Sequence, residues 1–490
     1  VIIHTEGEIC GNIQELTNSP IFERIVHAFM DHLKKHNSLL SDSLFPPEAE
    51  LSYRSKILSL LRILTTSSLE EVVKILPDYS YFLDKKNLLH EFVEKLYNFW
   101  RRYERYMICH SESGIYSHDQ KPYRTFNMTV ERLSHLVRAG YRDICENITG
   151  THPRVYRQVD AGCQAGIIAV PKIWNPPSEE YRELLSIPFI RQLMIQPPLL
   201  LDPPMNKRTG KFERIPQNPL EQIEVMPHEW LCYPAKVGPL LILVYVHEKF
   251  YELGLSLCNL FELADDEFLN HPVDAVYVFG VPGTSLDALA PMPTVFYDDL
   301  EHGMIAAACP NNDLFGYFGY LKKMVLTLHN IKMMKLGKMP YHGAMVRIMT
   351  KGDRPLTLLI IGDTGTGKSE TLEAFRIIGD DQIEEMTTIA DDMGSLDIDQ
   401  EGNVIGYGTE IGAFVRLDDL QPGYAFGQLD RSIIMNPNQV NARIVLPVTT
   451  YENVIKGYSV DMVLYANNYE EIDEEHPIIE RLATPERALH

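Results

Sequence analysis

The sequence predicts an α/β protein of several domains that begins with a helical module. The chain has 490 residues, more than a single hydrophobic core usually serves. Apolar residues within 21–33 recur at helical spacing. The pattern of residues 356–378 predicts a buried strand, a glycine-rich loop and a helix. We therefore expect a helical module over residues 1–110, a mixed α/β domain over 111–334 and a second α/β domain over 335–490.

The composition is that of an ordinary globular protein, with 45% hydrophobic and 23% charged residues. A formal net charge of −22 argues against non-specific nucleic-acid binding, which requires a basic face. The seven cysteines are scattered without metal-ligand spacing, as expected for buried thiols in a reducing compartment rather than for disulfides or structural zinc. No apolar run approaches the roughly 20 residues that span a bilayer. We therefore expect a cytoplasmic protein that binds neither nucleic acid nor membrane.

Residues 1–110 carry helix signals and no catalytic pattern. Ser19-Pro20 has the form of an N-cap followed by proline at the first helical position. Ser68 and Glu71 have the spacing of a capping box before another apolar run. We interpret this module as a packing element, and we expect any protein partner of the chain to bind there.

The middle of the chain mixes helix and strand signals. Apolar residues over 130–148 share one helical face, and Gly150 can end that helix. The runs "LLILVYV" (240–246) and "AVYVFGV" (275–281) are typical of buried strands. The basic stretch "KRTGK" (207–211) is by itself typical of a solvated loop. These signals favour a mixed α/β domain between the helical module and the glycine-rich loop.

The glycine-rich stretch "IIGDTGTGKSETLEAF" (360–375) carries the strongest functional pattern. Its glycines let successive backbone N–H groups turn inward toward a phosphate, and the N-terminus of the following helix adds partial positive charge. Lys368 would reach the β- and γ-phosphates, and the Ser369 hydroxyl would bind Mg²⁺. We therefore predict that this P-loop binds a nucleoside triphosphate, expected to be ATP. Its predicted nucleotide-binding residues are Gly362, Asp363, Thr364, Gly365, Thr366, Gly367, Lys368 and Ser369.

A P-loop also needs a carboxylate to hold its metal, and two aspartate pairs follow this loop. Asp380-Asp381 comes just after the predicted helix, where solvated aspartates are common. Asp391-Asp392 ends a run rich in β-branched residues, and a strand there would deliver its side chains to the loop. We favour Asp391-Asp392 on placement, with Asp380-Asp381 as the alternative.

Two segments upstream of the loop, "GYFGYLKKM" and "MPYHGAM", resemble the ATP-type phosphoenolpyruvate carboxykinases. Members of that family carry Tyr-Gly-Gly-Glu-Met-Lys-Lys and then Met-His-Cys-Ser-Ala, in which the second lysine and the histidine are metal ligands. Lys323 and His342 match these ligands at the family's separation. The resemblance further implies a catalytic role for Lys322, which matches the first lysine, and a substrate contact for Tyr317.

The resemblance continues downstream of the loop. The segment "TEIGAFVR" is similar to the family's Phe-Glu-Gly-Gly-Cys-Tyr-Ala-Lys, with Glu410 in register and Arg416 in place of a phosphate-contacting lysine. The segment "NARIVLPVTTYENVIKG" resembles Asn-Thr-Arg-x-x-Tyr-Pro, and Arg443 matches the arginine that contacts the transferred phosphoryl group. Several matches in one order are more specific than any single match. The resemblance therefore implies a carboxykinase-like nucleotide domain, with a cleft between it and the mixed α/β domain.

Other features depart from the carboxykinase pattern. Asp363 and the Ser369-Glu370 ending resemble HPr kinase/phosphorylase instead. The motif that grips the dicarboxylate is missing, and Arg208 in "NKRTGK" is only a weak substitute. The segment that would contact the purine is also missing, so we expect the nucleotide domain to continue beyond residue 490.

These residues predict metal-dependent phosphoryl transfer between ATP and a small anionic substrate. We expect Ser369 to hold nucleotide-bound Mg²⁺, and Lys323, His342 and Asp392 to hold a second ion, Mn²⁺, because nitrogen and carboxylate ligands suit a transition metal. The leading hypothesis is a carboxykinase-type reaction. One alternative is a kinase of the HPr-kinase type that phosphorylates a hydroxyl with Asp391 as general base. Another is a nucleotide-sensing regulator without chemistry.

Overall fold

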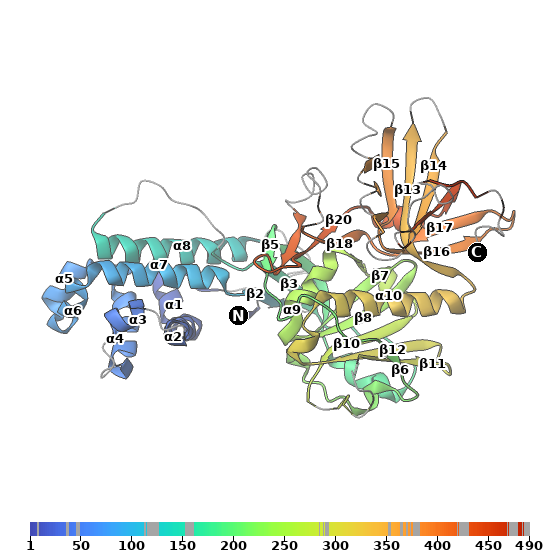
Figure 1. The fold of residues 1–490 in the computed structure, drawn as a ribbon. Coiled ribbons are helices and arrows are strands. Elements are labelled where there is room, and N and C mark those ends of the chain that lie inside the picture. Colours follow the sequence, from blue (N-terminus) through green and yellow to red (C-terminus); the bar gives the residue numbers. More distant parts are fainter. Residues whose placement is uncertain are drawn as a thin grey trace. The chain divides into compact units, whose positions relative to one another are not determined.

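The structure is a computed structural model of mixed α/β class with several sheets (Figure 1). It describes all 490 residues except 7–8, 36–38, 46–49, 112–113, 115–126, 152–160, 284, 288, 290–293, 351–353, 363–365, 369–370, 373, 376–382, 419, 421–430, 468, 470–478, 483 and 485–490. Two compact units make up the chain: unit 1 is residues 1–171 with 190–196, and unit 2 is residues 172–189 with 197–490. No helix among the described residues is long and apolar enough to cross a membrane.

Unit 1 combines helices with strands in the order β1-β2-β3-β4, of which β1, β2 and β3 pair in parallel. Its strands are β1 (Ile2–Thr5), β2 (Tyr106–His110), β3 (Ala165–Val170) and β4 (Phe189–Ile195), of which the first residue belongs to unit 2. Its helices are α1 (Ile13–Asn18), α2 (Pro20–Lys35), α3 (Leu39–Leu44), α4 (Glu50–Ile63), α5 (Leu69–Ile75), α6 (Ser80–Asp84), α7 (Lys86–Arg102) and α8 (Met128–Thr149). The helical prediction for residues 1–110 therefore holds for most of that range, with strands at both of its ends.

Local sequence signals explain several helix ends in unit 1. Helix α2 begins at Pro20, as predicted. The Ser68 and Glu71 side chains form the predicted capping box at the start of α5. Gly150 ends α8 in the left-handed region, at a φ of 71° that favours glycine.

The core of unit 1 is apolar. Helices α2, α4 and α7 bury one face each, and Ile144 and Ile148 of α8 join the same cluster. Helices α7 and α8 lie side by side (Figure 1), where the Tyr97 and Tyr141 rings stack with centroids 4.0 Å apart. Beside this stack lies a cavity of about 190 Å³ whose lining is nearly all apolar and includes Gly140.

Unit 2 begins with a sheet in the order β7-β8-β10-β12-β11-β6, and β9 pairs with β7. Its strands are β6 (Glu213–Arg214), β7 (Trp230–Val237), β8 (Leu240–His247), β9 (Glu262–Leu263), β10 (Ala275–Val281), β11 (Val295–Asp299) and β12 (Met304–Pro310). Strands β8 and β10 occupy the two predicted apolar runs, and every residue of both strands is buried. Helices α9 (Tyr251–Ser256) and α10 (Phe318–Lys335) pack against this sheet (Figure 1).

A second sheet of unit 2 has the order β21-β17-β16-β13-β14-β22, with β15 also paired to β13. It contains β13 (Met339–Thr350), β14 (Leu356–Gly362), β15 (Ile383–Ala390), β16 (Met393–Ile398), β17 (Val404–Gly408), β21 (Tyr458–Ser459) and β22 (Met462–Ala466). A smaller sheet, β18-β20-β19-β5, contains β5 (Leu199–Leu201), β18 (Gly412–Arg416), β19 (Ile433–Met435) and β20 (Arg443–Pro447). Helix α12 (Tyr451–Ile455) follows β20.

The strand directions bring three predicted site segments to one edge of the second sheet. Strands β14 and β15 both pair antiparallel with β13, so their C-terminal ends, Gly362 and Ala390, lie at the same edge. Residue Gly343 of β13 pairs with Ile361 there, which places His342 at this edge too. The P-loop, the histidine and the Asp391-Asp392 pair thus start from one sheet edge, the usual place for ligands in α/β folds.

The division into units differs from the predicted domain boundaries at 110 and 334. Helix α8, predicted in the middle domain, packs in unit 1, where the Tyr141 hydroxyl donates to Glu94 Oε1 at 2.6 Å. Apart from residues 111–171 and 190–196, the predicted middle domain falls within one unit with the predicted nucleotide domain, and α10 of the first carries side chains that contact Asp392 of the second. Sequence periodicity locates elements, but it does not show which of them pack together.

Candidate functional site

The carboxylate of Asp392 is the centre of the candidate site. It follows β15 at the sheet edge, and its Oδ2 atom lies 2.8 Å from Lys322 Nζ and 2.6 Å from Lys323 Nζ. Its Oδ1 atom lies 2.9 Å from His342 Nε2. One carboxylate therefore joins two consecutive residues of α10 to the histidine of β13. The structure brings together the three side chains predicted as metal ligands, Lys323, His342 and Asp392, together with Lys322.

The two lysines differ strongly in burial. The side chain of Lys323 is 32% exposed, whereas that of Lys322 is 2% exposed. The Lys322 ammonium also lies 3.4 Å from Glu410 Oε1, and Glu410 is itself buried. Helix α10 begins at Phe318, so both lysines sit in its first turns, but only Lys323 resembles the solvated lysine that such a position usually holds.

Burial and charge act in opposite directions on these groups. Burial raises the pKa of Asp392, but attraction to Lys322, the contact with His342 and attraction to Lys323 together hold that pKa well below its usual value. Burial lowers the pKa of Lys322, and the charges of Asp392 and Glu410 reverse this and raise it. Burial raises the pKa of Glu410 to about 8, more than Lys322 lowers it. Near neutral pH the site therefore holds charged Lys322 and Asp392 beside a largely protonated Glu410.

The described part of the P-loop lies at the end of β14. Gly362 ends the strand, and the Lys368 ammonium folds back to donate to the Gly362 carbonyl at 2.8 Å. Gly367 has a φ of 83°, in the left-handed region that favours glycine. Residues 368, 371–372 and 374–375 are helical, as the prediction of a helix after the loop requires. The predicted residues Asp363, Thr364, Gly365 and Ser369 and the alternative pair Asp380-Asp381 lie outside the described residues.

The residue after His342 shows why the histidine can reach this edge. A Cβ atom on Gly343 would lie 2.4 Å from the Ile360 carbonyl oxygen. Only glycine lets β13 approach β14 this closely, and the approach holds His342 beside the start of the loop. Asp391, the other member of the favoured pair, is 6% exposed and adjoins Asp392.

The two predicted phosphate-contacting arginines are partners across a strand pair. Arg416 of β18 lies opposite Arg443 of β20 in the antiparallel register. Like charges in this arrangement repel, so an anion between them would stabilise the pair. The Arg443 guanidinium carbon lies 5.6 Å from the centre of the Phe414 ring, and its Nε atom is buried without a hydrogen-bond partner among the described residues. Arg416 instead forms an ion pair with Asp418.

The two predicted substrate residues have different environments. Tyr317 is buried, and its ring centre lies 6.0 Å from that of Phe414. Burial raises the pKa of the Tyr317 hydroxyl, although the positive charges of Arg443, Lys322 and Arg208 oppose this. Arg208 is exposed and its guanidinium stacks over Phe212, so the basic loop is largely solvated, as its sequence indicates.

Two residues near these groups were not among the predicted site residues. Phe414 has Arg443 on its ring at 5.6 Å and the Lys322 ammonium at 5.9 Å, and so it links the arginine side to the lysine side. Glu410 lies in the segment that resembles the carboxykinase pattern, and its alignment with the family's glutamate was the sequence signal that could have identified it. Its burial against Lys322 depends on tertiary packing, which the sequence does not show.

The donor set around Asp392 fits a divalent transition metal. Imidazole, carboxylate and amine donors suit Mn²⁺ and related ions. An octahedral ion with ligands at about 2.1 Å has neighbouring ligands roughly 3 Å apart. The 2.9 Å separation of His342 Nε2 and Asp392 Oδ1 is compatible with that spacing as well as with the hydrogen bond that these atoms form. Lys323 would have to bind as the neutral amine.

Comparison with known proteins does not identify the chain. No protein-family model matches it, and no curated protein matches it significantly. The assignment of a function therefore rests on the residues and on their geometry.

Proposed function

We propose that unit 2 is a carboxykinase-like P-loop phosphotransferase. In this proposal it binds ATP with Mg²⁺ at the loop of residues 362–369 and transfers a phosphoryl group between the nucleotide and a small anionic substrate. The leading reaction converts oxaloacetate and ATP into phosphoenolpyruvate, carbon dioxide and ADP.

One observation carries the proposal. The Asp392 carboxylate contacts Lys322, Lys323 and His342 within 2.9 Å, at the sheet edge where β14 also ends and the P-loop begins. A loop that only binds nucleotide has no need for three cationic or metal-binding side chains on one carboxylate. Phosphoryl transfer does need such a set, because it depends on positioning and on neutralising the charge of the transferred group.

Each side chain has a role in the proposed reaction. Arg443 and Arg416 would neutralise negative charge on the phosphoryl oxygens, which guanidinium groups do well. Lys322 keeps its proton beside Asp392 and would orient an anionic substrate by charge. Tyr317 and Phe414 would exclude water from the arginine side of the site. The carboxylate of Asp392 would hold the metal together with Lys323 and His342.

Bound there, a divalent ion would act as a Lewis acid toward a substrate oxygen. The support for this role is the kind of donor atom that Lys323, His342 and Asp392 offer. Glu410 would keep the region behind Lys322 free of a second full negative charge at neutral pH, because its pKa is raised to about 8. The net charge near the substrate would therefore be positive, which suits an anionic substrate.

The test is an assay of the purified chain with oxaloacetate, ATP, Mg²⁺ and Mn²⁺, following phosphoenolpyruvate. We expect turnover that Lys323→Met lowers by at least about 100-fold, the scale of losing an electrostatic contact to the transition state. Lys335→Met is the matched control, since Lys335 also lies on α10, is 32% exposed and pairs with an aspartate. Its activity should stay near that of the unmodified chain.

Nucleotide binding is tested separately by calorimetry. Lys368→Ala should abolish ATP binding without unfolding the chain, because its ammonium would contact the β- and γ-phosphates. Unchanged affinity would remove the loop from the proposal. Turnover of ATP that ignores oxaloacetate but requires a hydroxyl-bearing acceptor would replace the carboxykinase reaction by a kinase reaction. Tight ATP binding without turnover would instead indicate a nucleotide sensor.

A further inference from the structure

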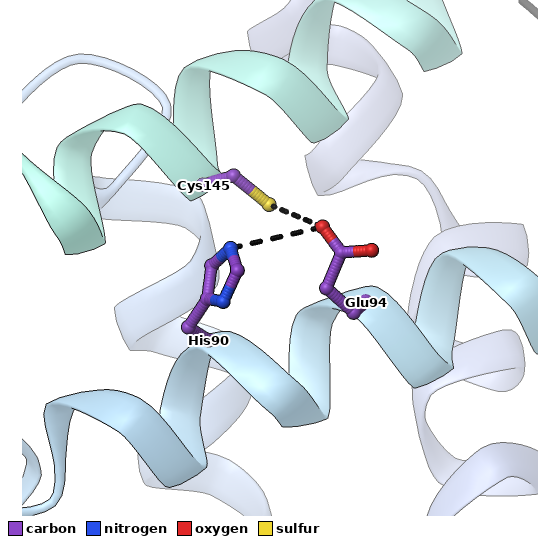
Figure 2. A group of neighbouring side chains, drawn as sticks. All are labelled: His90, Glu94 and Cys145. Carbon is purple, nitrogen blue, oxygen red and sulfur yellow. Dashed lines mark hydrogen bonds and ion pairs between the residues drawn. The ribbon is translucent and has the colours of Figure 1, made fainter. Parts of the chain in front are cut away.

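Unit 1 contains a group of potential metal ligands on two neighbouring helices. His90 and Glu94 are four residues apart on α7 and therefore share one face of that helix. Cys145 of α8 faces them, and the ligand atoms of all three lie within 4.8 Å of one another. Figure 2 shows the imidazole nitrogen and the sulfur both directed at the same Glu94 oxygen.

The distances are compatible with a tetrahedral ion as well as with the weak thiol–carboxylate hydrogen bond that Cys145 forms with Glu94. His90 Nε2 lies 3.7 Å from Glu94 Oε1, and Cys145 Sγ lies 3.8 Å from the same oxygen. Tetrahedral zinc with bonds of about 2.0–2.3 Å separates its ligands by roughly 3.3–3.7 Å. An ion could enter the group with small side-chain adjustments and no change in the helices.

Access and support also fit an ion. The side chains of His90 and Glu94 are 37% and 39% exposed, whereas Cys145 is 8% exposed. Solvent therefore reaches the group from the α7 side, and the thiol lies at its inner end. The Tyr141 hydroxyl donates to Glu94 Oε1 at 2.6 Å, and such a contact orients a carboxylate ligand from outside the coordination shell.

We propose that His90, Glu94 and Cys145 form a zinc site that links α7 to α8. Zinc is the ion of choice because it accepts imidazole, carboxylate and thiolate together in a tetrahedral arrangement. Three protein ligands leave the fourth position to water on the exposed side. Binding displaces the thiol proton to solvent and forms the Zn–S bond, so no oxidant or reductant takes part.

The site is independent of the proposed phosphotransferase chemistry. All three ligands belong to unit 1, and the residues proposed for metal binding in unit 2 offer no sulfur. No sequence pattern indicates this site, since 55 positions separate His90 from Cys145 and no second cysteine lies nearby in the chain.

Cobalt(II) is the probe, because a Co²⁺–thiolate bond absorbs in the near ultraviolet and metal bound through nitrogen and oxygen alone does not. We expect the metal-free full chain to gain one equivalent of this absorption on titration with Co²⁺ and to lose it when Zn²⁺ is added. Cys145→Ser should abolish the band. His90→Ala, at an exposed position that leaves the core intact, should weaken Co²⁺ binding by at least about 100-fold, and Tyr141→Phe by about 10-fold.

His135→Ala provides the matched control, because His135 is an exposed histidine on α8 outside the group. It should leave the band and the affinity unchanged. Zn²⁺ should also raise the melting temperature of the unmodified chain but not of His90→Ala, since a ligand that binds only the folded state stabilises it. No thiolate band in the unmodified chain, or a band that persists in Cys145→Ser, would overturn the proposal.

Discussion

The helical core of unit 1 and the Asp392 site of unit 2 are stabilised in opposite ways. In the helical core, Val26, Leu61 and Phe92 are fully buried among other apolar side chains. Beside Asp392, the buried Lys322 ammonium lies 2.8 Å from the half-buried Asp392 carboxylate and 3.4 Å from the buried Glu410 carboxyl group. Apolar packing tolerates small changes of neighbours, whereas each buried charge depends on its own partner.

The difference indicates which region is under functional constraint. Buried ion pairs are weak sources of stability, since desolvation offsets most of the attraction. Lys322 and Glu410 are nevertheless both 1% exposed. A hydrophobic pair of similar volume would serve the fold at least as well. We infer that the charges of unit 2 are retained for their chemistry, and the following experiments test that contrast.

The largest expected effect is that of Asp392→Asn. The amide leaves Lys322 charged, buried and without its closest anion, and breaking a buried pair costs about 3–5 kcal/mol. Glu410 lies 3.4 Å from the ammonium and can ionise in its place, so we expect a loss of about 3 kcal/mol in the free energy of unfolding. Urea unfolding followed by circular dichroism measures it.

Asp397→Asn is the control for this substitution. Asp397 pairs with Lys338 at 3.2 Å in the same sheet, but its side chain is 40% exposed. An exposed pair contributes about 0–1 kcal/mol, so the control should change stability little. Equal effects of the two substitutions would contradict the contrast between buried and exposed pairs.

The next effect is the contribution of Glu410 to the pH dependence of stability. Its pKa is raised from 4.5 to about 8, so between these values the folded chain holds a proton that the unfolded chain has released. The free energy of unfolding must then fall as pH rises through this window. Between about pH 6 and pH 8 the fall should be about 2 kcal/mol for this group.

Glu410→Gln isolates the contribution, because the amide is similar in size and does not titrate. Stability measured in urea at both pH values should fall more steeply for the unmodified chain than for the variant. Parallel pH profiles would show that Glu410 is ionised in the folded chain. Asp392 acts in the opposite sense: its lowered pKa gives stability that is lost only as pH falls below about 4.

Sequence patterns predicted much of the local structure and less of the site. The capping box at Ser68, the end of α8 at Gly150 and strands β8 and β10 depend on neighbouring residues, and each lies where the pattern predicted it. Lys323 and His342 were grouped through a family resemblance, and Asp392 was added because of its placement after a predicted strand. The structure brings them within contact distance, and their role remains a proposal.

What the sequence did not show depends on long-range packing. The burial of Glu410 against Lys322 joins residues 88 positions apart, and neither position has an unusual local pattern. The attachment of α8 to α7 through Tyr141 and Glu94 likewise moved the boundary of the helical unit beyond residue 110. Periodicity reports which face of an element is buried, but not which element covers it.

A smaller effect is expected at the capping box of α5, where the interactions are local and exposed. Ser68 accepts a hydrogen bond from the Glu71 backbone N–H, and the Glu71 carboxylate accepts one from the Ser68 N–H. Ser68→Ala removes the first of these and should lower the free energy of unfolding by about 1 kcal/mol. Thermal unfolding measures this, with Ser67→Ala as the neighbouring control outside the box. A loss as large as that of Asp392→Asn would remove the distinction between local and buried polar groups.

The last comparison is a glycine-to-alanine substitution, which should change stability in opposite directions in the two units. Gly140 lies inside helix α8 and lines the apolar cavity, and a Cβ atom there would lie 3.2 Å from Ile13 Cγ2. Alanine favours the helix by about 1 kcal/mol, and a side-chain methyl group can shift, so Gly140→Ala should stabilise the chain by about 0.5 kcal/mol.

Gly343→Ala adds the same methyl group 2.4 Å from the Ile360 carbonyl oxygen, which belongs to a paired strand and cannot shift without disturbing the sheet. It should destabilise the chain and displace His342 from Asp392. Urea unfolding of both variants decides: if Gly343→Ala were also stabilising, the close approach of β13 to β14 would not be what holds the histidine at the sheet edge.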